Sequence, residues 1–374
     1  MASSSHKQQL FPNLYGATAA PPPTPSTQPN HHLVTSATAA DVLSKLLHRL
    51  PPTLSLPTRR SPASTTTSLP TISFSAPNLN DLILSSASKL GFFQLTGHDI
   101  SPQLANSAET ESLSLFELSK DQKESCFPKN WPLGFDADEE EEDGDGKGES
   151  FCLDGSCSTE SKDLSLSSLR EFTRALEKLG LTIFEKVANA VGVENPIGED
   201  PTRFCSYMWI SEGLHGENKP SGGSYPYVIG LQYQIRCQKY SLLADSGWVS
   251  VSPQVDSVMV TFGDIAHVWS NGKLKKVRGR PVACLGDGNN DSRGVTMSLL
   301  VTLPMDSTVA PLLPNVNSNE NGDNNDGDET QACDNKGKKE ENKLMFNSFS
   351  FEDYAWRVYH ESLHFKDPLD RYRI

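Results

Sequence analysis

The sequence contains no long apolar run. No stretch among its 374 residues approaches the roughly 18 consecutive apolar residues that a membrane span requires. The N-terminus also lacks the continuous apolar core of a secretory signal. We therefore expect no membrane association and predict a cytoplasmic protein. A plastid destination stays open, because the first residues are rich in hydroxyl side chains and contain no acid before Asp41.

Cysteine is also scarce. The seven cysteines are an odd number spread over a long chain, which indicates reduced thiols in a cytosol-like compartment. Cys152 and Cys157 form one close pair, but no second pair stands at zinc-site spacing, so a structural zinc is not expected. Only 36% of the residues are hydrophobic and the mean hydropathy is −0.44, which indicates that part of the chain is not packed.

The chain has no excess of basic residues. Its net charge of −14 comes mainly from two acidic runs, 136–145 and 320–341. Without these runs, acidic and basic residues nearly balance, so neither a nucleic-acid-binding surface nor a polyanionic one is indicated. Motifs of other enzyme classes are missing too, including Gly-x-Ser-x-Gly and the phosphate-binding Gly-x-x-x-x-Gly-Lys.

Composition divides the chain into three parts. Residues 1–68 are rich in Ser, Thr, Pro and Ala and are predicted to be a low-complexity, mostly disordered leader, interrupted by one short helix at 40–50. Residues 69–200 are predicted to form an α/β region with an acidic loop at 136–149. Residues 201–374 are predicted to form a β-rich domain, with an acidic insertion at 315–343 and a closing helix.

Apolar spacing predicts the main helices at 79–90, 101–118, 164–191 and 350–363. Short β-rich runs follow an early strand pair; the predicted strands are 69–74, 92–95, 204–210, 225–236, 248–251, 256–262 and 295–303. Helices followed by strands of antiparallel type predict an α+β chain whose second half is a sandwich or jelly roll.

Four segments together resemble a known family. They are Leu90–His98, Gly247–Pro253, Phe262–Asp264 and Ser270–Lys273. These segments are similar in content and order to those of plant 2-oxoglutarate- and Fe(II)-dependent dioxygenases of the isopenicillin N synthase and gibberellin oxidase type, and the resemblance covers residue 69 to the C-terminus. It implies a double-stranded β-helix (jelly roll) with an N-terminal helical region packed on it. In the family, this barrel holds iron through a His-x-Asp pair and a distant His, which leaves positions open for 2-oxoglutarate and dioxygen.

The expected ligand positions carry other residues. Counting back from Trp248 places the family's His-x-Asp at Gly223 and Tyr225, and counting on from Asn271 places the distant His at Gly279. Counting back from Pro304 places the Arg-x-Ser that anchors 2-oxoglutarate at Val295 and Met297. No His-x-Asp occurs anywhere in the chain.

Loss of three metal ligands should abolish iron binding, because even an outer partner of a ligand is worth about 10- to 100-fold in affinity. From these positions we expect no cofactor and a non-catalytic homologue that binds a small apolar ligand or a protein as a monomer. Tyr225 and Tyr227 share one face of a regular strand and are the predicted pocket residues.

An alternative is an active oxygenase with relocated ligands. His215, Glu217 and His267 are the candidate metal ligands, and Arg293 is the candidate anchor for 2-oxoglutarate. Fe(II) and 2-oxoglutarate are then the cofactors, and a small plant metabolite or hormone is the substrate. Each candidate also has a purely structural interpretation. His215 could be a loop histidine, His267 a surface histidine in a helical turn, and Arg293 a solvated arginine at a strand edge.

Overall fold

The computed structural model describes residues 65–137, 148–161, 164–198, 200–212, 224–284, 294–312, 344–361 and 367–374. These residues belong to one compact unit that begins at Ser61. The predicted helix at 40–50 and most of both acidic segments lie outside them, as do His215, Glu217, Gly223 and Arg293.

Two sheets form the centre of the described chain. The large sheet has the order β2-β3-β10-β7-β12-β6-β5-β4, the small sheet has the order β1-β9-β8-β11, and β13 pairs with β14. The bounds are β1 (Thr65–Thr66), β2 (Thr71–Ser73), β3 (Phe92–Thr96), β4 (Gly134–Ala137), β5 (Glu149–Asp154), β6 (Cys205–Glu212), β7 (Ile229–Tyr233), β8 (Tyr240–Ala244), β9 (Gly247–Val251), β10 (Val258–Phe262), β11 (Val277–Ala283), β12 (Val295–Thr302), β13 (Thr308–Val309) and β14 (Phe349–Ser350).

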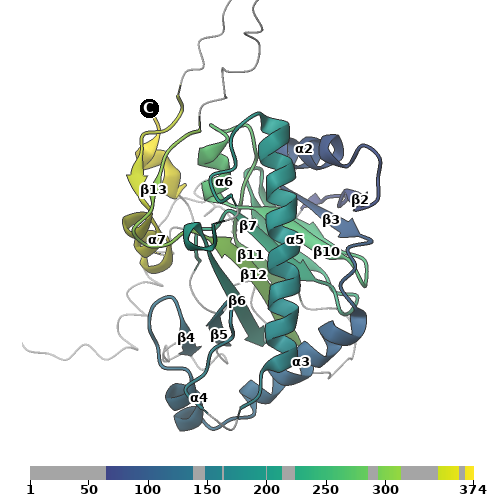
Figure 1. Ribbon diagram of the computed structural model, residues 1–374, viewed down its shortest axis with the longest axis vertical. Coiled ribbons are helices and arrows are strands. Elements are labelled where there is room, and N and C mark those ends of the chain that lie inside the picture. The colour runs from purple at the N-terminus through teal and green to yellow at the C-terminus, as the bar shows by residue number, and fades with distance from the viewer. Residues whose placement is uncertain are drawn as a thin grey trace, which may run out of the picture. The chain divides into compact units, whose positions relative to one another are not determined.

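Helices cover one face of the large sheet, as Figure 1 shows for α5. The helices are α2 (Leu79–Lys89), α3 (Pro102–Phe116), α4 (Lys120–Cys126), α5 (Ser167–Val191), α6 (Asp264–Trp269) and α7 (Phe351–His360), with two short 3-10 helices, η1 (Pro201–Arg203) and η2 (Pro368–Tyr372). α5 forms because apolar residues recur every three or four positions along it, and it ends at Gly192 in the left-handed conformation (φ 81°). At Gly180 the helix approaches the sheet so closely that a Cβ would lie 2.7 Å from Leu231 Cδ1.

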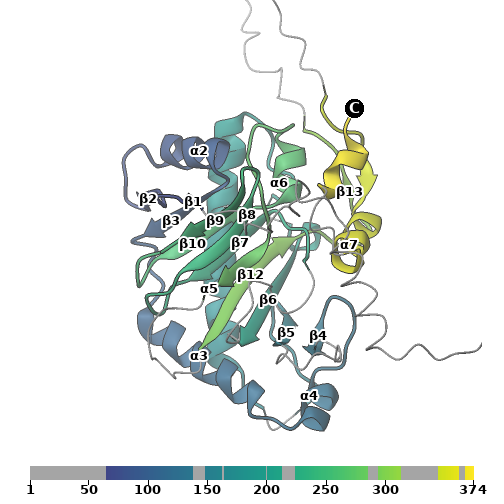
Figure 2. The same ribbon diagram turned by 180° about the vertical axis from the view of Figure 1, so that it is seen from behind.

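Alternation along the strands separates a helix-facing side from an inward side. Ile229, Leu231 and Val301 lie against α5, so Gly230 and Leu300 point to the opposite side. On that inward side a second apolar core lies between the two sheets; it contains Phe92, Tyr240, Leu242, Val249, Val251, Met259 and Val277. Figure 2 shows the molecule from the side of the small sheet.

The fold class predicted from the sequence is confirmed: the protein is an α+β chain with a jelly-roll barrel and helices packed on it. β2 and β3 are in the same sheet as β10, which comes from the second half of the chain. The division at residues 200/201 therefore stays a prediction based on composition. Within the described residues, no helix is both long and apolar enough to cross a membrane.

His98 connects the loop after β3 to the turn before β10. Its Nδ1 accepts a hydrogen bond from the backbone N–H of Ile100, and its Nε2 donates one to the carbonyl oxygen of Asp256, both at 3.2 Å. The neutral imidazole of His98 therefore makes a hydrogen bond through each ring nitrogen, one as acceptor and one as donor. Burial lowers the pKa of His98 below its ordinary value of 6.5, although the Asp256 carbonyl opposes this shift.

We expect the protein to lose stability as the pH falls below about 6.5, because the unfolded chain then binds a proton at His98 that the folded chain resists. The His98→Asn variant should show a smaller fall, since Asn can still accept the Ile100 hydrogen bond but does not titrate. Urea unfolding at about pH 7.5 and about pH 5.5 measures the difference. An equal fall in the two proteins would contradict this prediction.

Candidate functional site

Aromatic side chains fill one end of the barrel. Tyr225 is only 1% exposed and lies before β7 in an extended segment. Its ring centroid is 5.5 Å from that of Tyr207, 6.0 Å from Trp131 and 6.2 Å from Phe351. Tyr207 pairs with Leu300 across β6 and β12 and so points inward. Tyr225 therefore occupies the space where the resemblance places a metal ligand.

Tyr227 reaches across the barrel to the small sheet. Its hydroxyl lies 2.9 Å from the carbonyl oxygen of Val277 and 3.1 Å from that of Gly279, and its proton is shared between these acceptors. Thr261 Oγ1 lies 3.1 Å away on the large sheet. Burial raises the pKa of Tyr227, so the phenol stays protonated and connects the two sheets. Tyr225 and Tyr227 thus both lie inside the barrel but contact different residues.

Tyr227→Phe should destabilise the protein by about 1–3 kcal/mol, because the carbonyl groups of Val277 and Gly279 lose a buried hydrogen-bond donor. Tyr240→Phe is the matched control, since the Tyr240 hydroxyl makes a longer 3.4 Å bond to the Gln238 side chain. Urea unfolding of both variants measures the effect. Similar losses in the two variants would contradict a bridging role for Tyr227.

Gly279 has a backbone that disfavours other residues. Its φ is 64°, in the left-handed region, and a Cβ there would lie 3.1 Å from Ser224 Oγ. It stands between Arg278 and Val282, where the pairing of β11 with β8 shifts register. A histidine in this conformation would be strained, so the position counted for the distant metal ligand does not suit one.

The two positions counted for the 2-oxoglutarate anchor do not line the barrel. Met297 lies on the helix-facing side, where its Sδ accepts a hydrogen bond from Ser112 of α3 at 3.3 Å. Val295 shares its side by alternation, whereas Thr296 and Ser298 point inward. Counting back from Pro304 therefore misses the inward-facing positions of β12 by one residue.

His267 is not the surface histidine that its turn position suggests. It is 5% exposed, and its ring packs against Phe346, with 5.5 Å between centroids. Its Nδ1 lies 2.6 Å from the carbonyl oxygen of Leu274, so Nδ1 carries the proton, while the buried Nε2 has no hydrogen-bond partner. Burial lowers the pKa of His267, which keeps this lone pair unprotonated.

The described residues at the barrel end do not fit an iron site of the family's kind. Across the described ranges, no group of three or more His, Cys, Asp and Glu side chains is placed to hold a metal. Tyr225 and Gly279 supply no suitable ligand at the counted positions. Of the relocated candidates, His267 alone lies within the described chain, and the structure does not bring it together with His215 or Glu217, which lie outside it.

Arg280 is a barrel residue that sequence reasoning missed. It is 7% exposed, its Cζ lies 4.0 Å from the ring centroid of Trp209, and its Nη1 donates a 3.0 Å hydrogen bond to Ser211 Oγ. Its position directly after Gly279, where the resemblance places the distant histidine, was the available signal. Burial lowers the pKa of Arg280 to about 10.

Several buried polar atoms of the barrel have no hydrogen-bond partner. They include Trp209 Nε1 and Gln232 Nε2 on the inward side, and Gln234 Oε1 just beyond β7. A small cavity of about 10 Å³, enough for one water molecule, lies beside Gln232 and Thr296. Most natural buried polar groups are satisfied, so these atoms indicate a water molecule or a ligand.

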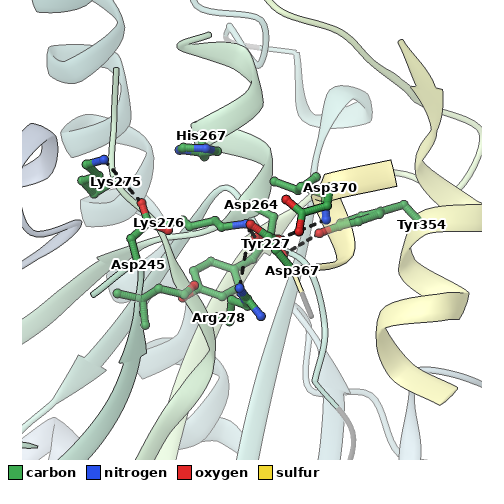
Figure 3. Close-up of polar contacts among 12 residues, drawn as sticks. Tyr227, Asp245, Asp264, His267, Lys275, Lys276, Arg278, Tyr354, Asp367 and Asp370 are labelled. Atoms are coloured by element: carbon green, nitrogen blue, oxygen red, sulfur yellow. Dashed lines mark hydrogen bonds and ion pairs between the residues drawn. The ribbon is translucent and has the colours of Figure 1, made fainter. Parts of the chain in front are cut away.

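A buried ionic cluster lies beside the barrel, and Figure 3 shows it with Tyr227. Lys276 is 1% exposed, and its Nζ lies 2.6 Å from Asp367 Oδ1 and 3.1 Å from Asp264 Oδ1. Tyr354 of α7 donates a 2.8 Å hydrogen bond to Asp264 Oδ2. Burial raises the pKa of Asp367, but Lys276 and Arg278 outweigh this effect and lower it. The cluster therefore fixes the C-terminal residues to α6 and β11.

Sequence comparisons identify similar proteins. Residues 69–155 match the model of the family described as non-haem dioxygenase in morphine synthesis N-terminal. Gibberellin 2-beta-dioxygenase 1 of Pisum sativum is 24% identical over 276 residues, which cover 67% of this chain and 81% of that protein. 1-Aminocyclopropane-1-carboxylate oxidase 2 of Doritaenopsis is 22% identical, covering 74% of this chain and 84% of that protein.

Solved structures share the fold. A crystal structure of JOX2 in complex with 2OG, Fe and JA has a TM-score of 0.62 at 16% identity, covering 83% of this chain and 90% of that one. The 2-oxoglutarate complex of dioxygenase for auxin oxidation 1 from Arabidopsis thaliana has a TM-score of 0.52 at 18% identity, covering 65% of this chain and 96% of that one. These complexes contradict our expectation of no cofactor, because JOX2 binds 2OG and Fe and the auxin dioxygenase binds 2-oxoglutarate.

Proposed function

Because the chain belongs to the superfamily of 2-oxoglutarate- and Fe(II)-dependent dioxygenases, we propose that it is an oxidoreductase that acts on a small organic metabolite with Fe(II) and 2-oxoglutarate. When bound, these cofactors supply oxidation by dioxygen. The relatives named for gibberellin and auxin support a substrate of hormone size. In this proposal Tyr225 is not a metal ligand, so other residues of the chain hold the metal.

The state of His267 is the observation in the structure that supports relocated ligands. Metal-binding histidines usually donate their second ring N–H to a carbonyl or carboxylate, which orients the ring and leaves the other nitrogen to the metal. His267 has this arrangement, with Nδ1 bonded to Leu274 and Nε2 buried without a partner. We propose His215 and Glu217 as the further ligands and Arg293 as the anchor of 2-oxoglutarate.

A second candidate function is binding without turnover. Tyr225 favours it, since an aromatic ring packed against Tyr207 and Phe351 occupies the end of the barrel. In this case the barrel or its outer surface takes a small apolar molecule or a protein partner. Both candidates use the same scaffold, so a measurement of turnover separates them.

The test is an anaerobic titration of the full chain with Fe(II) and 2-oxoglutarate, followed by a measurement of succinate after admission of air. We expect a rise in melting temperature that depends on both additions, because a ligand of the native state stabilises it, and then release of succinate. His267→Ala should weaken Fe(II) binding by more than the about 10- to 100-fold loss seen for an outer partner.

His360→Ala is the matched control, because His360 also bonds a carbonyl through Nδ1 but is exposed. It should bind Fe(II) like the unmodified protein. Absence of both the thermal shift and succinate would overturn the oxidoreductase proposal and leave binding without turnover. Equal binding in the two variants would exclude His267 as a ligand.

A further inference from the structure

We infer that the outer face of α7 is a docking surface for a basic segment of a protein partner, which places an arginine side chain over the indole of Trp356, beside Glu352 and Asp353. The surface consists only of described residues. It lies outside the barrel and needs neither the metal nor turnover, so the inference goes beyond the proposed function and is tested separately from it.

Two sides of α7 differ in exposure. The helix lies at the periphery in both ribbon views (Figures 1 and 2). Its buried residues are Phe351, Tyr354, Ala355 and Val358. The opposite side is exposed and carries Glu352, Asp353, Trp356 and His360. At 3.6 residues per turn, these four exposed positions fall within an arc of about 100°. An indole, an imidazole and two carboxylates therefore share the outer face.

The state of Trp356 is the first support for a partner. The residue is 51% exposed, although a large aromatic side chain gains free energy from burial. Its ring stacks on His360, with 4.6 Å between centroids and 27° between planes, and His360 Nδ1 donates a 2.8 Å hydrogen bond to the Trp356 carbonyl oxygen. The His360 ring in turn packs against Tyr359 at 5.0 Å and Trp131 at 5.9 Å. An exposed tryptophan that is already held in place suits a binding hot spot, because little side-chain entropy is lost on binding.

The charge of the outer face is the second support, and it selects a cation. Glu352 and Asp353 precede Trp356 by four and three residues, so their side chains are its neighbours on the helix surface. Among the described residues, neither carboxylate takes part in an ion pair. Arg357 of the same helix is held by Glu361 through bonds of 3.0 and 3.1 Å and so does not neutralise them. The first turn of a helix favours acidic residues in any case, but a cation over the indole would gain from the ring and from both carboxylates.

The shape of the outer face suits a peptide segment. From Glu352 to His360 it is about 12 Å long at 1.5 Å per residue, which about four residues of an extended chain can cover. A helix surface is convex and does not enclose a small molecule as a pocket does. Its negative charge repels nucleic acids and anionic membranes. Arginine is favoured over lysine, because a guanidinium can stack flat on the indole and donate hydrogen bonds to a carboxylate at the same time.

The experiment is a titration of the full chain with the peptide acetyl-Arg-Ala-Arg-Ala-amide and with a neutral match in which citrulline replaces both arginines. The indole N–H signal of Trp356 in a proton–nitrogen correlation spectrum reports the site, and its absence in Trp356→Ala assigns it. The signal of Trp248, which is 36% exposed on β9, is the internal control. Fluorescence anisotropy of the labelled peptide measures the affinity.

Two variants remove the two supports separately. Trp356→Ala removes the ring, and Trp248→Ala is its control. The double variant Glu352→Gln, Asp353→Asn removes the charges. Its control is Glu171→Gln, Glu185→Gln, which also removes two exposed carboxylates from a helix, here α5. This control has the same net charge, so it accounts for unspecific attraction of a basic peptide to an acidic protein.

We expect the arginine peptide to bind in the millimolar range or more tightly, and the citrulline peptide to bind at least about tenfold more weakly. Trp356→Ala should weaken binding by about 5- to 30-fold, and the double variant by about 3- to 10-fold. Each control should stay within about twofold of the unmodified protein. Added salt should weaken binding, because the carboxylates are exposed.

Three results of the titration would overturn the inference. They are no shift of the Trp356 signal at millimolar peptide, equal binding of the arginine and citrulline peptides, and equal affinity in a variant and its control. A dimer that Trp356→Ala dissociates in sedimentation analysis would also overturn it, because the outer face would then bind a second copy of the chain. Failure of the succinate test together with peptide binding at Trp356 would reject the oxidoreductase proposal and leave this surface intact.

Discussion

Lys276→Met should destabilise the protein by about 3–5 kcal/mol. The change leaves the buried Asp264 carboxylate without its cation, while Asp367 keeps only its longer contacts to Arg278 and Arg373. Breaking a buried ion pair from one side has a cost of this size. Because Asp367 belongs to the C-terminal residues, we also expect those residues to detach before the barrel unfolds. Urea unfolding and hydrogen exchange at α7 and η2 measure the two effects.

The neighbouring lysine provides the control. Lys275 is about half exposed, and its Nζ lies 3.8 Å from Asp245, so Lys275→Met should change the free energy of unfolding by less than about 1 kcal/mol. Replacing both carboxylates as well, in the triple variant Lys276→Met, Asp264→Asn, Asp367→Asn, should recover part of the loss because no buried charge then remains unpaired. Equal losses in Lys275→Met and Lys276→Met would disprove the role of the cluster.

Gly263→Ala should destabilise the protein by about 4 kcal/mol or more, or prevent folding. A Cβ on this residue would overlap the carbonyl oxygen of Tyr227 and lie 2.8 Å from Tyr227 Cδ2. The backbone around it cannot move away freely, because the N–H of Gly263 donates a 3.0 Å hydrogen bond to Val228. Overlap with backbone atoms in a packed core is one of the few causes of so large a loss. Soluble expression and urea unfolding measure it.

Gly155→Ala is the matched control. Its Cβ would lie 3.3 Å from Glu177 Oε2 and 3.4 Å from Ser206 Cβ, contacts that small side-chain shifts can relieve. We expect a change within about 1 kcal/mol. If Gly263→Ala were as stable as Gly155→Ala, the close approach of β10 to the segment before β7 would be wrong.

Local signals in the sequence were sufficient for most helices. The Ser101–Pro102 pair predicted the start of a helix, and Ser101 does cap α3 with its side chain. The apolar spacing from Leu166 predicted the long helix, which forms as Ser167–Val191. These features depend on neighbours within a few residues, which the sequence displays directly. The strands β4, β5, β8 and β11 and the helix α4 were missed, because elements of four to seven residues carry too few positions for an apolar period to stand out.

The candidate site was predictable only in part. Tyr225 was expected inside the barrel from an ungapped count back from Trp248, and the structure places it there, beside Tyr207. Val295 and Met297 were assigned to the barrel by a count that a shift of one residue invalidates, since side chains alternate along a strand. The stacking of Arg280 on Trp209 joins β11 to β6, and no local pattern shows which side chains meet across a barrel.

The strand order also bears on how the chain folds during translation. β3 pairs with β10, whose residues follow it by about 160 positions in the sequence. β6 is separated from β7 in the large sheet by β12, which comes later in the chain. At about 5–20 residues per second, a ribosome needs on the order of ten seconds or more to supply β10 after β3. During that interval the amphipathic α5 and the edges of the early strands stay uncovered. The nascent chain should therefore be a chaperone client until β12 has emerged, and its first 200 residues should not fold when released early.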